Sequence, residues 1–178
     1  MTAPIPTRAS AHRLFLLRHA DAVGWAANGD RERPLSAHGR DQAHEAGTQV
    51  RQLRPAMVWS SPARRARETA EQLGSGHTPE LQEGLYHATA DSMLGMLRAL
   101  PEKVESILLV AHAPGIPDLA WELASKDSDG ELRRLLERGF PTCTLVGLEF
   151  TGRWSEPVSY THLRAHETDS YLVCRLLL

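Results

Sequence analysis

Two histidines and two arginines stand where the sequence could place them around a phosphate group. Arg18 and His19 follow one apolar run, His112 follows another, and Arg65 lies in a predicted helix between them. The planar guanidinium of arginine matches phosphate oxygens and stays charged at any working pH. A histidine among such charges is held neutral, and a neutral imidazole is a competent nucleophile towards phosphorus. The combination indicates phosphoryl transfer, with positioning and charge neutralisation supplying most of the rate.

Apolar runs that alternate with helical patterns must position these side chains. The expected strands are residues 13–17, 56–59, 106–111 and 144–150, with a short extended segment at 81–86. The expected helices are residues 37–53, 62–73, 91–100, 117–124 and 131–138. This alternation predicts an α/β fold of three layers, with a mostly parallel central sheet flanked by helices. Functional groups gather beyond the carboxyl ends of the strands in such a sheet, so the four side chains should meet at one edge.

The composition limits the classes of function. The 178 residues suit one domain, and the formal net charge of −2 leaves no basic field for nucleic acid or an anionic membrane. Two cysteines give no disulfide framework and no cysteine-based zinc site. No apolar run approaches the roughly 20 residues that cross a bilayer. Residues 1–11 lack the apolar core of a signal peptide and are expected to be a loose leader, so the protein is expected to be cytoplasmic.

Four short motifs surround the two histidines and two arginines. They are LRHA at residues 17–20, RPLS at 33–36 with Gly39, SSP at 60–62 with Arg65 and Thr69, and VAHAPG at 110–115. Each motif is weak alone, but in this order and spacing they resemble the histidine phosphatase superfamily, the phosphoglycerate-mutase-like proteins. The short chain and the RPLS segment resemble its SixA-like phosphohistidine phosphatase branch, and the expected domain spans residues 12–157.

The resemblance implies a role for each of the four residues. His19 would be the nucleophile that forms a phosphohistidine intermediate, and Arg18, Arg65 and His112 would bind the phosphoryl group. Arg65 is preferred to Arg64 because the family places its arginine four residues after the serine of Ser-Pro. The reaction would need no metal and no other cofactor.

Three further residues near the motifs carry weaker implications. Glu83 resembles the position where mutase-like relatives carry their acid, so it is predicted as a catalytic proton donor, with a surface position as the alternative. Asp30 and Arg33 are expected to hold the loop after the nucleophile rather than to touch substrate.

Three functions fit these residues. The first is a phosphatase that acts on phosphohistidine of a partner protein of the histidine phosphotransfer type, because little chain lies between Thr69 and His112 to build a helical lid. The second is a phosphomonoesterase for a small metabolite ester, which would depend more on a proton donor such as Glu83. The third is a phosphate-binding module without catalysis, which would be expected to lack His19 or an arginine. The sequence does not fix the oligomeric state.

Residues 158–178 are expected to be a non-native tail. Their sequence resembles translated sequencing-adapter sequence, and we therefore exclude them from functional interpretation. His162 and His166 are four residues apart with Glu167 adjacent, a spacing seen in zinc sites. Because these residues lie in the suspect tail, no metal site is predicted.

Overall fold

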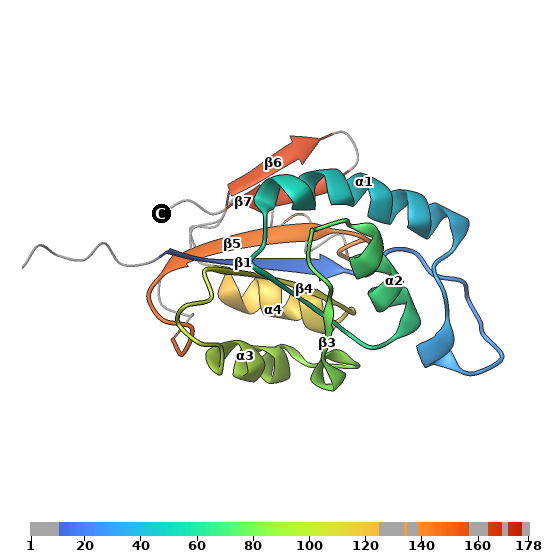
Figure 1. Cartoon of the computed structure of the whole chain (residues 1–178), viewed down its shortest axis with the longest axis horizontal. Helices are drawn as coiled ribbons and strands as arrows, with labels where there is room; N and C mark the ends of the chain where they lie inside the picture. Colours follow the sequence, from blue (N-terminus) through green and yellow to red (C-terminus); the bar gives the residue numbers. More distant parts are fainter. Residues whose placement is uncertain (1–10, 125–133, 135–138, 157–163, 169–170, 176–178) are drawn as a thin grey trace, which may run out of the picture.

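Seven strands of the described residues form one sheet in the order β3-β2-β4-β1-β5-β7-β6 (Figure 1). The computed structural model describes residues 11–124, 134, 139–156, 164–168 and 171–175. Strand β1 is parallel to β4, β2 is parallel to both β3 and β4, and β7 is parallel to β5, whereas the β1–β5 and β6–β7 pairs are antiparallel. The sheet is therefore mostly parallel, as predicted. The strands are β1 (Ala11–Arg18), β2 (Met57–Ser60), β3 (Glu80–Leu81), β4 (Ser106–Ala111), β5 (Leu145–Thr151), β6 (Arg164–Thr168) and β7 (Tyr171–Arg175).

Helices cover both faces of the sheet, which confirms the three-layer fold. Figure 1 shows α1 above the strands and α3 below them, and the buried residues of α1 and α2 share one core whereas those of α3 and α4 share the other. Two 3-10 turns, η1 and η2, lie in the connecting loops. The bounds are α1 (Ala37–Leu53), α2 (Arg64–Gln72), α3 (Ala90–Arg98), α4 (Gly115–Leu123), η1 (Asp30–Glu32) and η2 (Glu83–Leu85).

The two helical layers explain why the central strands read as continuous apolar runs. Along β1, Leu14 and Leu16 enter the core that includes α3 and α4, whereas Phe15 and Leu17 enter the core that includes α1 and α2. Strand β4 alternates in the same way, and every one of its residues is buried. Successive side chains of a strand point to opposite faces, so a strand covered on both faces needs apolar residues throughout.

Helix α1 starts as the sequence predicts and fixes the loop that follows the first motif. The Ser36 side chain accepts a hydrogen bond from the Gly39 backbone N–H at 2.9 Å, which caps the helix. A Cβ at Gly39 would overlap the Asp21 carbonyl oxygen, so only glycine allows this approach. The loop after His19 is thereby held against the start of α1.

The segment after α2 is less extended than the sequence predicts. Only Glu80–Leu81 forms a strand, and the chain then tightens into the η2 turn. Within it, the backbone N–H of Leu85 donates to the Gln82 carbonyl at 3.0 Å and that of Tyr86 to the Glu83 carbonyl at 3.1 Å. The extended prediction for residues 81–86 was therefore wrong beyond Leu81, because local hydrogen bonds replace sheet pairing there. The helix expected at 131–138 falls almost wholly outside the described residues.

Part of the expected non-native tail contributes backbone to the sheet edge. Strand β7 pairs with β5 through Leu145–Val173 and Val146–Cys174. The non-native origin of residues 158–178 stays a prediction, and so does the loose leader, of which only Ala11 is described. In the part of the chain that the structure describes, no helix combines the length and apolarity needed to cross a membrane.

Candidate active site

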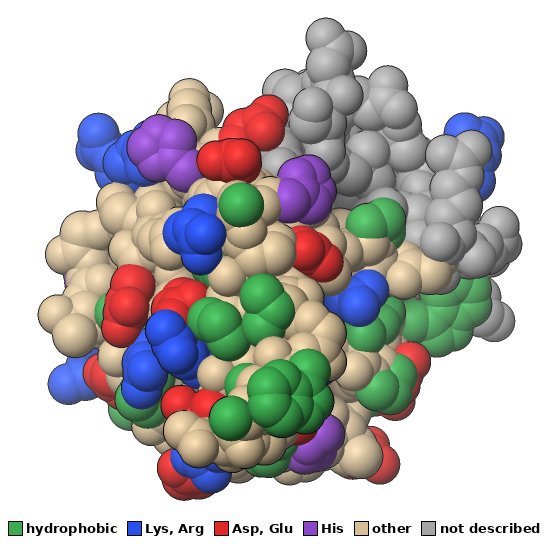
Figure 2. All heavy atoms as spheres, turned by 90° about the vertical axis from the view of Figure 1, so that its right-hand side faces the viewer, with side chains coloured by type: hydrophobic (Ala, Val, Ile, Leu, Met, Phe, Trp, Pro, Cys, Tyr) green, Lys and Arg blue, Asp and Glu red, His purple; other side chains and the backbone are tan. Residues whose placement is uncertain are grey.

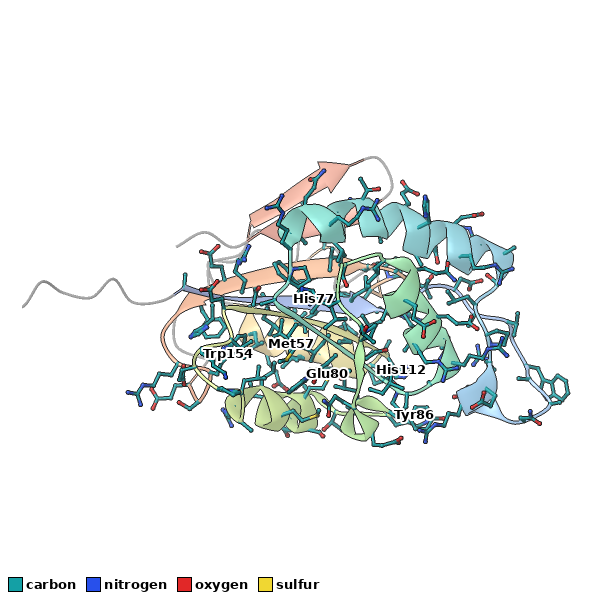
Figure 3. All side chains as sticks on the ribbon, in the orientation of Figure 1. Met57, His77, Glu80, Tyr86, His112 and Trp154 are labelled. Carbon is teal, nitrogen blue, oxygen red and sulfur yellow. The ribbon has the colours of Figure 1, made fainter. Side chains whose placement is uncertain are left out.

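The carboxyl ends of β1, β2 and β4 meet at one edge of the molecule. The His19 backbone N–H donates to the Ala111 carbonyl and that of Ser61 to the Val110 carbonyl, both at 2.9 Å. These bonds hold the residues after the three strands in register. His112 and Tyr86 lie at this end of the sheet, and Trp154 lies at the other (Figure 3).

His19 presents one ring nitrogen to an acceptor and the other to a donor. Its Nδ1 lies 2.7 Å from the Ala20 carbonyl oxygen, which can only accept, so Nδ1 carries the proton. Its Nε2 lies 3.2 Å from Nε of Arg65, whose N–H donates to it. The lone pair on Nε2 is therefore the nucleophilic one.

The surroundings of His19 keep this ring neutral. Burial is the main cause that lowers the pKa of His19 to about 4, and the positive charges of Arg65 and Arg18 contribute to this shift against the opposing hydrogen bond to Ala20. A neutral ring at physiological pH leaves Nε2 unprotonated.

His112 lies beside His19, with the two ring centroids 5.0 Å apart. Its Nε2 is 2.8 Å from the Ser61 hydroxyl oxygen, which already accepts a hydrogen bond from the Ala63 N–H at 3.3 Å. The Ser61 hydroxyl can donate to Nε2, and in that tautomer the proton of His112 resides on Nδ1. This Nδ1 is buried without a hydrogen-bond partner, and burial lowers the pKa of His112 to about 3. A buried donor without a partner suits a phosphoryl oxygen.

Arg18 contributes a second buried donor at the same edge. Its NH1 donates to the Phe140 carbonyl at 2.7 Å, while its buried Nε has no hydrogen-bond partner. Burial lowers the pKa of the Arg18 guanidinium. The contact with Phe140 anchors the side chain and leaves Nε as a donor for an anion.

Arg65 is almost fully buried, with 5% of its surface exposed, and it links His19 to the loop that carries Asp30. Besides its bond to His19, NH1 donates to the Asp30 carbonyl oxygen at 2.7 Å and NH2 to the Asp30 carboxylate at 3.0 Å. Thr69 connects helix α2 to the residue after His19, because its hydroxyl accepts from the Ala20 N–H and donates to the Arg65 carbonyl.

Asp30 holds the loop, as expected, and also contacts Arg65, which the sequence did not reveal. A hydrogen bond from Arg33 at 2.8 Å is the first cause that lowers the pKa of Asp30 to about 2, and Arg65 and Tyr86 add to it. The Tyr86 hydroxyl donates to the same carboxylate at 3.1 Å. Asp30 thus meets Arg65, which lies 35 positions further along the chain, and Tyr86, which lies 56 positions further. No local pattern could indicate these contacts.

Glu83 is the one predicted site residue that the structure does not bring to the other four. Its carboxylate pairs with Arg31 at 2.6 Å, and 74% of its side chain is exposed. Basic and acidic side chains lie beside one another on this face of the molecule (Figure 2). The position of Glu83 matches that of a surface residue more closely than that of a catalytic proton donor.

Neither a metal cluster nor a reactive thiol stands out among the described residues. No group of three His, Cys, Asp or Glu side chains within the described ranges could hold a metal ion. The Cys143 thiol is buried, and burial raises its pKa to about 12, so it is not a nucleophile at neutral pH.

Known proteins with a similar sequence or structure include histidine phosphatases. Residues 14–103 match the histidine phosphatase superfamily (branch 1). An uncharacterized protein of Mycobacterium leprae is 32% identical over 127 residues, covering 70% of this chain and 79% of that protein. A phosphohistidine phosphatase SixA homolog of Haemophilus influenzae is 30% identical over 128 residues, or 64% of this chain and 77% of that protein. A Nakamurella multipartitia structure assigned as a SixA phosphohistidine phosphatase has a TM-score of 0.73 at 28% identity and covers 96% of this chain and 95% of its own.

Proposed function

Because the chain belongs to the histidine phosphatase superfamily and is a phosphatase, we propose that it hydrolyses phosphohistidine on a partner protein through transient phosphorylation of His19. The observation that carries this proposal is the arrangement of His19. Its Nδ1–H is fixed on the Ala20 carbonyl, and its neutral Nε2 faces the Arg65 guanidinium. A phosphoryl group that takes the place of this hydrogen bond at Nε2 would meet an unprotonated nitrogen and a positive charge together.

The surrounding donors supply the rest of the first step. As Nε2 attacks phosphorus in line, charge spreads over the equatorial phosphoryl oxygens. The unpartnered Arg18 Nε and His112 Nδ1 would bind these oxygens, together with Arg65. Donors that are fixed before the reaction cost no reorganisation when charge develops, which is how such sites accelerate the transfer. Water then attacks the phosphohistidine, and the bond to His19 breaks.

Two observations support a protein-borne substrate. Relatives at 28–30% identity are assigned to the SixA phosphohistidine phosphatases. The described segment between α2 and α3 forms only β3 and η2, so no helix from it covers the catalytic edge. An edge that this segment leaves uncovered would admit a phosphorylated side chain on the surface of another protein.

A direct comparison of substrates tests the proposal. Purified protein would be given a phosphorylated histidine phosphotransfer domain and, in parallel, a panel of sugar and nucleotide phosphate esters. We expect kcat/KM for the phosphoprotein to exceed that for every ester by at least about 10²-fold, since alkoxides leave less easily than imidazole. A higher kcat/KM for an ester would instead favour the metabolite phosphatase.

Chelation tests the expected independence from metals. Arg18, Arg65 and His112 would meet the phosphate charge without a cation, so EDTA should leave turnover unchanged. Loss of activity in EDTA that a divalent ion restores would contradict this part of the proposal.

A further inference from the structure

We propose that His87 is a further catalytic residue, the proton donor to the leaving group. This inference rests on the proposed function, since it assigns the proton transfer of that same reaction. His87 is a solvent-exposed residue that follows η2, and no sequence motif indicated it. Imidazole is the side chain that enzymes use most often as a general acid or base.

The first observation is a series of three neighbouring imidazoles that ends at the surface. His19 is 5.0 Å from His112, and His112 is in turn 6.3 Å from His87, measured between ring centroids. His19 is half-buried and His112 is 7% exposed, whereas His87 is open to solvent. In an in-line transfer the leaving group departs on the side of phosphorus away from the attacking nitrogen. A leaving group that departs from the half-buried His19 towards solvent therefore passes the rim, where His87 lies.

The second observation is the backbone of His87, which has a φ of +55°. This left-handed conformation is uncommon for residues other than glycine, and such residues concentrate at functional sites. Here it seats the imidazole against Tyr86, with ring centroids 4.0 Å apart. Tyr86 is held in turn by its hydrogen bond to Asp30, which contacts Arg65. The position of His87 is thus fixed relative to the phosphate-binding residues.

The third observation is the close packing of the segment that carries His87 onto the turn that carries His112. A Cβ at Gly115 would overlap the Ala88 carbonyl oxygen and would lie 2.8 Å from the methyl carbon of Met93. Only glycine at this position allows residue 88 to approach so closely. His87 and His112 are therefore anchored to one another through the backbone on either side.

Other candidates near the rim are already engaged. The Glu83 carboxylate is paired with Arg31, and the Tyr86 hydroxyl donates a hydrogen bond to the Asp30 carboxylate. Among the described residues of the segment 83–87, His87 is left as the titratable side chain next to His112.

The proton balance of the reaction is complete with His87. In the first half, the Nε2 lone pair of His19 forms the N–P bond, and the P–N bond to the substrate imidazole breaks. The electron pair stays on the leaving ring, which takes a proton from protonated His87 on its far nitrogen and departs neutral. In the second half, neutral His87 accepts a proton from the water that attacks phosphorus. The N–P electron pair then returns to Nε2 of His19 and phosphate is released. The proton taken from water leaves His87 protonated for the next cycle.

Two small phosphoryl donors separate this role from a structural one. Phosphoimidazole needs a proton on its leaving ring, whereas 1-methyl-3-phosphoimidazolium leaves as neutral 1-methylimidazole without one. The variant is His87→Gly, because glycine adopts the left-handed backbone without strain and so preserves the fold. We expect His87→Gly to slow the phosphorylation of His19 by phosphoimidazole, followed in a single turnover, by about 10²-fold. The same step with 1-methyl-3-phosphoimidazolium should stay within about threefold of wild type.

Added imidazole and a matched variant complete the test. Free imidazole should restore phosphoimidazole turnover in His87→Gly. The control variant His77→Gln changes an exposed loop residue and should resemble wild type with both donors. Equal slowing of His19 phosphorylation with both donors, or slowing with neither, would overturn the assignment of His87. If wild-type protein accumulates no phosphate on His19 with either donor, the proposed function itself fails, and the role of His87 falls with it.

Discussion

Strand β1 carries one histidine near each end, and their different surroundings separate a structural histidine from a chemical one. His12 is 2% exposed and presents both ring nitrogens to acceptors, the Val104 carbonyl at 3.0 Å and the Glu102 carboxylate at 3.4 Å. Its ring packs between Phe150 and Trp154. His19 instead has one acceptor, the Ala20 carbonyl, and one donor, the Arg65 guanidinium. The same side chain is thus a packing element at one end and a candidate nucleophile at the other.

The difference follows from what each end of the sheet must do. At the His12 end the Trp154 indole N–H also donates to the Val104 carbonyl, at 2.7 Å, so polar groups there satisfy one another. At the His19 end two buried nitrogens, Arg18 Nε and His112 Nδ1, have no hydrogen-bond partner among the described residues. Buried polar groups are ordinarily paired, and those that are not deserve a functional explanation. Unpaired buried nitrogens rather than buried histidines distinguish the candidate active site.

Replacing the nucleophile should give the largest effect. His19→Ala should reduce kcat with the phosphorylated phosphotransfer domain by at least about 10⁴-fold, because the covalent route is lost. The measurement is single-turnover release of phosphate. His12→Ala serves as the matched variant, and a comparable loss of kcat in a folded His12→Ala protein would contradict the distinction between the two ends.

The two adjacent arginines at the start of α2 should differ strongly. Arg65→Ala should lower kcat/KM by about 10²-fold to 10³-fold, because a fixed donor to the transferring group is lost. Arg64 is 44% exposed and pairs with Glu68 on the same helix, so Arg64→Ala should change kcat/KM by less than about threefold. Equal losses would show that the wrong arginine has been assigned.

Removal of His12 should weaken the fold instead of the chemistry. Truncation leaves a cavity between Phe150 and Trp154 and an unpaired Val104 carbonyl, so His12→Ala should lower the free energy of unfolding by about 2 kcal/mol. Urea denaturation measures this loss. His38→Ala on the exposed face of α1 should cost less than about 0.5 kcal/mol, and similar values for both variants would refute the structural role of His12.

The depressed pKa values of His19 and His112 predict a pH dependence of stability. In the folded protein the pKa values of His19 and His112 are about 4 and about 3, below the ordinary 6.5. At a pH between 6.5 and these values the unfolded chain therefore binds more protons than the folded protein. The free energy of unfolding should therefore fall as the pH is lowered from about 6.5 towards 4. Urea denaturation at pH 7 and pH 4.5 should show a smaller decrease for His19→Asn than for wild type. An unchanged decrease would mean that His19 is not the group that titrates.

Glu83→Gln should have the smallest effect on turnover. Its carboxylate pairs with Arg31 at the surface, and exposed ion pairs contribute little. We expect less than about threefold change with the phosphoprotein and with any ester that is cleaved. A loss of about 10²-fold with esters alone would restore Glu83 as the proton donor.

Most of the fold could be predicted because it depends on local patterns. The runs at β1 and β4 are apolar throughout since both faces of these strands are buried, and Ser36 caps α1 as its side chain suggests. The four residues Arg18, His19, Arg65 and His112 could be named for two reasons. They lie at or after the ends of strands that share one edge, and the motifs around them resemble those of the histidine phosphatase superfamily.

The contacts around those residues could not be predicted, because they join distant parts of the chain. Asp30 meets Arg65 across 35 positions, and Arg31 meets Glu83 across 52. Which carboxylate contacts Arg65 depends on how two loops lie over the sheet, and no local pattern determines that arrangement. The left-handed backbone of His87 is equally invisible in the sequence, because that conformation is unusual for histidine.

Rapid acid-free quenching of a single turnover tests the central claim most directly. Protein mixed with a radiolabelled phosphorylated phosphotransfer domain should carry transient label on a tryptic peptide that contains His19. The label should be stable in alkali and lost in acid, as expected of a phosphoramidate. It should be present in His12→Ala and absent in His19→Ala. Label on any other residue, or release of phosphate from the His19→Ala protein at the wild-type rate, would contradict the assignment of His19 as the nucleophile.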